Sequence, residues 1–274
     1  MDFNRKPFKK AALDQLKGRW GTAVISGLIF FAVYLFVFAP LVFTLIRVTL
    51  ANNTGNTGIE ESAGFFVHFF IVYFLTLLIL AVIIPIVSMA YIYVISQYAK
   101  TSEKLSISQF FRGFTLWAKG LGGFWHKGIH IFLWALLAEI IGGIVIFLVN
   151  KAGGTIATIF EVITEIVIFI FILRKSLSYS LNIYLLADNP NLKVTEALDL
   201  SIEYTEDNLW DLFVLDLSFL GWYYLSILTV GIGLLWLAPY YFLTEYNVAM
   251  YLKDETEELY KQITDEKKSE ETNE

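Results

Sequence analysis

Residues 185–241 read LLADNPNLKVTEALDLSIEYTEDNLWDLFVLDLSFLGWYYLSILTVGIGLLWLAPYY and decide the fold. A polar connector opens this stretch, and a long apolar run follows that is broken by Gly231 and Gly233. Apolar runs of about 18 or more residues are long enough to cross a bilayer as helices. With so short a link between them, we expect two spans, at about 210–229 and 232–251, to form a tight helical hairpin.

The composition of the 274-residue chain is that of a membrane protein. Hydrophobic residues make up 57% of it, charged residues only 17%, and the mean hydropathy is +0.61. A soluble domain carries about 25% charged residues. The absence of cysteine excludes disulfides, thiolate nucleophiles and zinc–sulfur sites, and three histidines leave little scope for a histidine metal centre. We therefore predict an all-α fold, a polytopic membrane helical bundle.

The hydropathy pattern predicts six transmembrane helices, arranged as three hairpins with cytosolic or interfacial helical extensions. The first apolar run is longer than the roughly 7–15 residues of a signal peptide, so we interpret it as a retained span. Residues 1–252 are expected to form one membrane domain, and the charged tail at 253–274 is expected to be disordered. The expected spans are at about 22–46, 65–98, 129–149, 155–186, 210–229 and 232–251.

The distribution of Lys and Arg predicts the orientation of these spans. Six such residues precede the first span and five lie at 99–128, whereas the opposite side has only Arg47 and Lys151. Because cytoplasmic segments are enriched in Lys and Arg, both termini are expected in the cytoplasm. The alternative of five spans, with 210–250 as one broken helix, would place the C-terminus outside and fits the charge pattern much less well.

Two segments beside the spans combine basic and aromatic side chains. Residues 1–21 place Phe8, Leu16 and Trp20 at helical spacing, which suits either binding to anionic lipid or a nonspecific anchor. Residues 99–128 mix five cations with phenylalanine and tryptophan, a combination that also occurs in nucleic-acid binders. Next to spans on both sides the mixture is typical of a membrane interface, so we expect lipid contacts and no nucleic acid.

Three parts of the chain share a plan, which suggests an internal repeat. In each, a short amphipathic segment and a tryptophan precede an apolar span, and the returning span continues into a tyrosine-rich extension. The leading segments are Ala12-Leu13-Asp14 with Trp20, Ser108-Gln109-Phe110-Phe111 with Trp117, and Ala197-Leu198-Asp199 with Trp210. The tyrosines are Tyr91, Tyr93 and Tyr98; Tyr179 and Tyr184; and Tyr240, Tyr241, Tyr246 and Tyr251. A pseudo-threefold arrangement would explain the plan, and so would composition alone.

Several segments carry a resemblance to a known family. They are Leu16-Lys17-Gly18-Arg19-Trp20-Gly21, Ala187-Asp188-Asn189-Pro190, Trp210-Asp211-Leu212-Phe213, Leu217-Ser218-Phe219-Leu220-Gly221-Trp222, and Leu228-Thr229-Val230-Gly231-Ile232-Gly233-Leu234-Leu235-Trp236 running to Pro239-Tyr240. Over nearly its whole length the chain resembles a family of bacterial integral membrane proteins, domain of unknown function 975. The resemblance implies a bacterial plasma membrane protein and supplies no activity and no site residues.

The Asp-Asn-Pro segment and the general plan are also distantly similar to the membrane domain fused to some glycerophosphodiester phosphodiesterases. The soluble catalytic barrel of those enzymes has no counterpart in these residues. Their activity is therefore not expected here.

Ionisable residues within the expected spans are the main candidates for a functional site. Charged groups in hydrocarbon are costly and usually face a bundle interior or water. Glu161 and Glu165 share one helical face, and Glu139 lies at a depth similar to that of Glu165. The set could form a proton or cation relay, structural pairs involving Arg174 or Lys175, or a shallow interfacial group. Its members are Glu139, Glu161, Glu165, Arg174, Asp216 and Glu245.

Other motifs give weaker signals. His126 and His130 have the spacing of a metal-binding pair, but no third ligand is evident nearby, so interfacial histidines are favoured. Gly231-x-Gly233 lacks the preceding strand and following lysine of a nucleotide loop, and we interpret it as a hairpin turn. We therefore predict no catalytic residues, no cofactor and no metal site.

These patterns favour a non-enzymatic membrane protein that organises or regulates membrane partners or lipids. Its expected partners are the lipid bilayer and either other membrane proteins or anionic lipids. A small transporter or channel that uses the intramembrane carboxylates is the alternative, and a membrane-embedded enzyme acting on lipid is the third hypothesis. Dry, fully paired spans would favour the organiser, and water-filled polar spans would favour the transporter.

Overall fold

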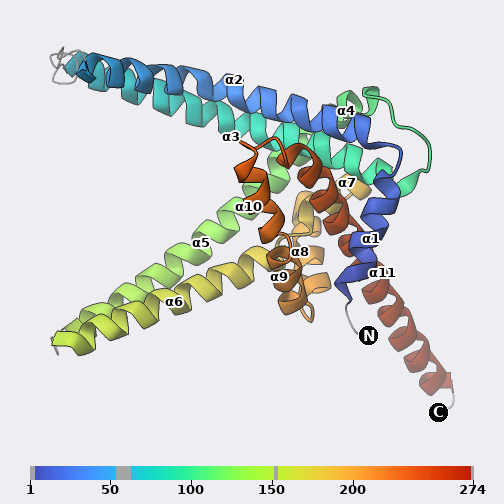
Figure 1. Cartoon of the computed structure of the whole chain (residues 1–274). Helices are drawn as coiled ribbons and strands as arrows, with labels where there is room; N and C mark the ends of the chain where they lie inside the picture. The colour runs from blue at the N-terminus through green and yellow to red at the C-terminus, as the bar shows by residue number, and fades with distance from the viewer. Residues whose placement is uncertain (1–3, 54–62, 151–153, 273–274) are drawn as a thin grey trace.

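The structure, a computed structural model, describes residues 4–53, 63–150 and 154–272, and every regular element within these ranges is helical (Figure 1). This confirms the expected all-α fold. The elements are α1 (Arg5–Leu16), α2 (Trp20–Asn53), α3 (Ala63–Lys100), α4 (Ser108–Gly113), the 3-10 helix η2 (Phe114–Leu116), α5 (Trp117–Asn150), α6 (Gly154–Ser178), α7 (Asn182–Asp188), α8 (Val194–Thr205), α9 (Leu209–Leu217), α10 (Leu220–Leu228) and α11 (Leu234–Thr272).

Within the described residues, four helical stretches are long and apolar enough to cross a membrane, which supports a membrane protein. They are Trp20–Arg47, Val67–Lys100, Ser108–Val149 and Leu209–Leu228. The expected spans at 155–186 and 232–251 are not among these four. The first region holds two glutamates and two basic residues, and the second holds Glu245, Asn247 and four tyrosines. The six-span arrangement therefore stays a prediction.

Two long pairs of helices project from a common centre (Figure 1). α2 lies along α3, and α5 lies along α6, and the two pairs diverge away from the centre. Within an apolar 18-residue segment of each membrane-length stretch, between 6% and 22% of the residues are buried. Apolar surface exposed on this scale needs lipid or a protein partner to cover it.

Two expected spans are divided in the structure. The expected span at 155–186 ends as α6 at Ser178, and a turn leads into α7. Ser201 of α8 stabilises this break, because its hydroxyl accepts a hydrogen bond from the Leu181 amide at 3.1 Å and donates one to the Ser178 carbonyl at 2.8 Å. The expected span at 210–229 is likewise divided into α9 and α10.

The last hairpin has its turn where the sequence places it, at 229–233 between α10 and α11. Gly231 has a φ of +84°, a left-handed conformation that glycine adopts without strain. Beyond this hairpin, the tail expected to be disordered differs from the structure, because α11 continues as helix to Thr272. This segment is rich in Glu and Lys, which favour helices, and Glu257 and Lys261 have the spacing of a helical ion pair.

The buried core lies where the helices converge, not along the projecting pairs. Tyr98 of α3, Tyr184 of α7 and Tyr246 of α11 are all buried in one hydrophobic cluster. The rings of Tyr184 and Tyr246 are 6.5 Å apart between centroids. The three tyrosine-rich extensions of the sequence therefore meet at the centre of the molecule.

Candidate functional site

Asp188, the last residue of α7, connects three helices. Its carboxylate accepts a hydrogen bond from the Tyr246 hydroxyl at 2.9 Å, and it lies 2.9 Å from Nζ of Lys100 and 3.2 Å from Nζ of Lys253. Lys100 is the last residue of α3, whereas Tyr246 and Lys253 belong to α11. We call these four residues the Asp188 junction. It joins the ends of α3 and α7 to the middle of α11.

The charge of Asp188 is maintained by its partners. Burial alone would raise its pKa, but hydrogen bonds from Lys100 and Tyr246, the charge of Lys100 and a hydrogen bond from Lys253 outweigh burial and lower the pKa. The carboxylate is therefore ionised at neutral pH. Its side chain is only 16% exposed, so these ion pairs are screened less by solvent than a pair on the surface.

Arg19 forms a second anchor, between the corner that joins α1 to α2 and the end of α3. Its guanidinium donates to the carbonyl oxygens of Gln15 at 2.8 Å, Tyr98 at 3.1 Å and Glu103 at 3.0 Å. The Tyr98 hydroxyl donates back to the carbonyl of Arg19 at 2.6 Å. Gly18 turns the corner with a φ of +73°. The Lys-Gly-Arg-Trp part of the sequence pattern therefore has a structural role.

The last hairpin encloses two carboxyl groups. The Tyr241 hydroxyl donates to Oδ1 of Asp216 at 2.8 Å, and Glu245 lies one turn further along α11 with 5% of its surface exposed. Oε1 of Glu245 is buried and has no hydrogen-bond partner among the described residues. Lys127 of α5 interacts electrostatically with both carboxyl groups. Its ammonium makes no ion pair within 4.0 Å in the described part of the chain.

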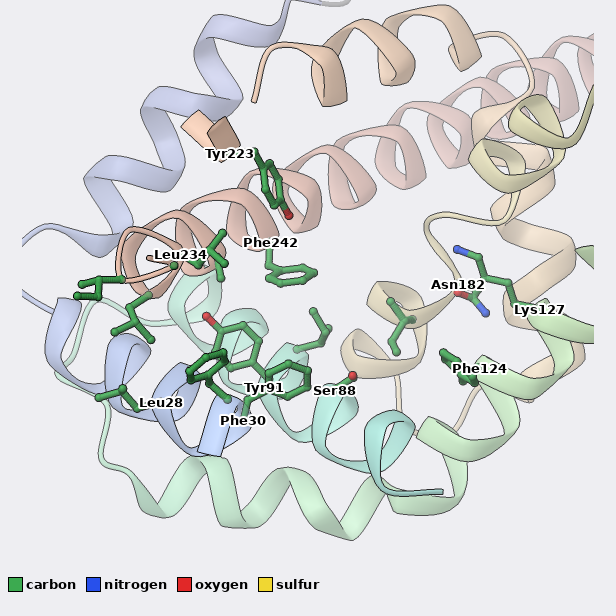
Figure 2. A pocket seen from close by; sticks show the side chains of 18 of the residues that line it. Leu28, Phe30, Ser88, Tyr91, Phe124, Lys127, Asn182, Tyr223, Leu234 and Phe242 are labelled. Atoms are coloured by element: carbon green, nitrogen blue, oxygen red, sulfur yellow. The ribbon is translucent and has the colours of Figure 1, made fainter. Parts of the chain in front are cut away.

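A cavity of about 740 Å³ lies where α2, α3, α5, α7 and the hairpin of α10 and α11 meet (Figure 2). Lys127 and Asn182 lie at one end of it in Figure 2, and Leu28 lies at the other. We call it the Lys127 cavity. Most of its lining is apolar, and its polar side chains are Ser88, Tyr91, Lys127, Asn182 and Tyr223.

Two of these polar side chains differ in how their hydrogen bonds are satisfied. The Asn182 amide nitrogen donates to the Gly123 carbonyl at 3.0 Å, which fixes the side chain against α5. The Tyr91 hydroxyl is buried and has no hydrogen-bond partner within the described ranges. Its ring is held between Phe242, 5.7 Å away, and Phe30, 6.4 Å away. The two side chains are therefore held by different contacts, a hydrogen bond for Asn182 and ring packing for Tyr91.

The structure divides the six predicted intramembrane residues into two groups. Glu139 on α5 and Glu161, Glu165 and Arg174 on α6 are exposed on the pair of helices that projects from the centre (Figure 1). Asp216 and Glu245 lie in the last hairpin instead. None of the six lines the Lys127 cavity. The set is therefore not assembled into one site within the described chain.

The structure also shows the contacts of the two basic residues on α6 and of the two histidines on α5. Lys175 lies over the Trp134 ring, with Nζ 4.5 Å from its centroid, and Arg174 forms no ion pair among the described residues. The rings of His126 and His130 are 4.4 Å apart between centroids. Within the described ranges, no three His, Asp or Glu side chains are grouped so that they could hold a metal ion.

Sequence reasoning did not select Asp188 or Lys127 as site residues. The predicted set contains ionisable groups within the expected spans, and Lys127 belongs to the basic and aromatic segment at 99–128. A carboxylate placed between a tyrosine-rich extension and an Asn-Pro turn was the available signal for Asp188. The available signal for Lys127 was its position directly before Gly128, at the start of an apolar run.

No curated protein and no solved structure matches the chain significantly. A family model described as "Protein of unknown function (DUF975)" matches residues 1–254. This range includes the Asp188 junction, Arg19 and the whole lining of the Lys127 cavity. The chain therefore belongs to the DUF975 family.

Proposed function

We propose that this protein is a non-enzymatic membrane protein that organises or regulates lipids or membrane partners in a bacterial plasma membrane. The observation that carries the proposal is the separation between its packed centre and its exposed helix pairs. The Asp188 junction holds α3, α7 and α11 together, while many apolar side chains of α2, α5, α6 and the first half of α3 are exposed. Such a molecule presents long surfaces to lipid or partner helices from one fixed base.

The proposal includes six spans with both termini in the cytoplasm. α1 packs against α11 through two hydrogen bonds between Gln15 and Asn247, at 3.3 and 2.9 Å. Helices that pack in this way lie on the same side of a membrane, which supports an even number of crossings. Pairing of α6 along α5 supports a crossing by α6, and the excess of Lys and Arg supports the cytoplasmic location.

The proposal also includes the internal repeat. The short helices α1, α4 and α8 each precede a longer apolar stretch, and α2 and α5 begin at Trp20 and Trp117. These parallels support three related helical hairpins. The distant similarity to the membrane domain of glycerophosphodiester phosphodiesterases adds no activity to this proposal.

A transporter that uses Glu139, Glu161 and Glu165 is the second candidate. A relay needs its carboxylates on one polar path that excludes lipid. Glu139, Glu161 and Glu165 are exposed on α5 and α6, which gives no support for such a path within the described single chain. The organiser is therefore the better supported function.

Native mass spectrometry of the full chain, extracted in a mild membrane mimetic, tests the proposal. An organiser is expected to retain a specific lipid or protein. A variant with Glu139→Gln and Glu165→Gln is expected to retain it equally, because these side chains lie away from the packed centre. A bare monomer, together with ion flux into proteoliposomes that the double variant abolishes, would contradict the proposal and favour transport.

A further inference from the structure

We propose that the Lys127 cavity binds one anionic phospholipid, with an acyl chain in its apolar part and the headgroup phosphate at Lys127. This inference rests on the proposed function and names its lipid class and binding site. It follows from the size of the cavity, the asymmetry of its lining, and the Lys127 ammonium, which makes no ion pair among the described residues.

The size and lining of the cavity suit an acyl chain. Its volume of about 740 Å³ lies within the range of about 300–1,000 Å³ that is typical of ligand sites. Apolar side chains from α2, α3, α5, α7 and α11 line it, and the rings of Tyr91 and Phe242 are in edge-on contact on one side, 5.7 Å apart between centroids. A space with apolar walls from several helices can surround a hydrocarbon chain.

The polar groups of the lining are not spread evenly. Lys127 and Asn182 lie together at one end of the cavity in Figure 2, whereas Leu28 and Leu234 lie towards the other. Asn182 is held in place by its hydrogen bond to the Gly123 carbonyl. One cationic, polar end and one apolar end match the two parts of an anionic amphiphile.

Lys127 supplies the charge complementarity. Among the described residues it is the one formally charged side chain in the lining, and it makes no ion pair there. Asp216 and Glu245 act on it electrostatically from behind the lining, but Asp216 already accepts the hydrogen bond from Tyr241. A phosphate oxygen at this end of the cavity would give the ammonium a direct, charge-assisted partner.

Tyr91 contributes its ring to the lining of the same cavity. Its hydroxyl oxygen is enclosed by protein and has no hydrogen-bond partner in the described ranges. Tyr91 therefore adds to the wall that an acyl chain would contact and not to the polar end of the site.

The rim of the cavity is open to the surroundings of the helices. Leu28 of α2 and Phe124 of α5 line the cavity and are exposed. A lipid can therefore enter sideways from the bilayer, without passage through the packed centre.

Native mass spectrometry with two defined lipids tests this site. The full chain is exchanged into micelles that contain either dioleoyl phosphatidylglycerol or dioleoyl phosphatidylcholine, which share their acyl chains and differ in net charge. Wild type is expected to retain one phosphatidylglycerol about tenfold or more in preference to phosphatidylcholine. Lys127→Gln is expected to abolish the preference and Lys127→Arg to keep it, whereas Lys104→Gln, which removes an exposed lysine outside this cavity, is expected to change nothing.

A second pair of variants tests the acyl part of the site. A Cβ on Gly27 would lie 3.8 Å from the Tyr91 hydroxyl, an ordinary contact distance, so Gly27→Leu extends into the cavity without displacing the backbone. It is expected to reduce retention of both lipids about tenfold. Gly143→Leu on the exposed face of α5, where nothing lies within 4 Å of the added Cβ, is the matched control.

The outcomes separate this inference from the proposed function. If wild type retains lipid but Lys127→Gln and Gly27→Leu retain it equally, the cavity is not the site and only this inference fails. If wild type retains no lipid and no protein from any membrane, the proposed function fails with it. Displacement of phosphatidylglycerol by millimolar inorganic phosphate would show an anion site instead of a lipid site. Equal retention of phosphatidylcholine and phosphatidylglycerol would show a site without preference for charge. Either result overturns the proposal.

Discussion

The Lys100 ammonium lies 2.9 Å from Oδ1 of Asp188, so the last residue of α3 is paired with the last residue of α7. The same carboxylate also meets Lys253 and Tyr246 of α11. Helix ends that leave a membrane have few neighbours and fray easily. Here a single carboxylate connects the end of α3 and the end of α7, the short helix that follows α6, to α11, at the centre from which the two helix pairs diverge.

Replacing Asp188 with Asn is expected to lower the stability of the full chain by about 1–2 kcal/mol, because it removes two ion pairs that are partly shielded from solvent. The thermal unfolding midpoint in detergent micelles measures this. Asp199→Asn is the matched control, since Asp199 is exposed and makes no ion pair among the described residues. Equal midpoints for the two variants would show that the junction contributes nothing to stability.

The stabilisation from Asp188 is expected to depend on pH. Because its pKa is lower in the folded chain than in the unfolded one, the stabilisation is present above the unfolded pKa of about 4 and is lost as the pH falls through the folded pKa. The difference in midpoint between wild type and Asp188→Asn should therefore be full at about pH 7 and shrink towards about pH 3. A difference that stays constant across this range would mean that the charge of Asp188 is not involved.

The long helices were predictable from sequence because the length and hydropathy of each apolar run are enough to predict a membrane-spanning helix. The breaks were not, because they depend on partners far along the chain. Ser201 of α8 stabilises the break after Ser178, and nothing in the local pattern of the apolar run shows that contact. The helical continuation of α11 was missed for a different reason, since a charged composition is typical of both disordered tails and solvated helices.

The candidate site was predicted less well than the fold, for a physical reason. Sequence shows that Glu139 and Glu165 lie at similar depth, but whether they face each other, lipid or another helix depends on how α5 and α6 are rotated. Lys127 is a candidate site residue because it lines a cavity formed by several helices. Asp188 is one because it pairs with lysines on two other helices. Periodicity along one helix contains no information of this kind.

Close packing of α4 against α3 gives a further prediction. A Cβ on Gly113 would lie 2.6 Å from Cα of Ala90, which is too short for any contact. Gly113→Ala is therefore expected to push α4 away from α3 and to destabilise the protein by about 1–3 kcal/mol, measured as the thermal midpoint in micelles. Gly143→Ala meets nothing within 4 Å and is expected to be neutral or to stabilise its helix by about 0.5–1 kcal/mol. The close approach is not significant if both alanine variants unfold at the same temperature.

The six-span topology can be tested directly, because the chain has no cysteine and single cysteines can be introduced one at a time. With both termini in the cytoplasm, the start of α6 and the turn between α10 and α11 face outside. A membrane-impermeant maleimide is therefore expected to label Thr155→Cys and Val230→Cys in spheroplasts, and Ser102→Cys only after the membrane is permeabilised. Val230 is 92% exposed, so a lack of labelling there cannot come from burial in the fold. Failure of Val230→Cys to react before and after permeabilisation would place it in the bilayer, which supports 210–250 as one broken helix and five spans.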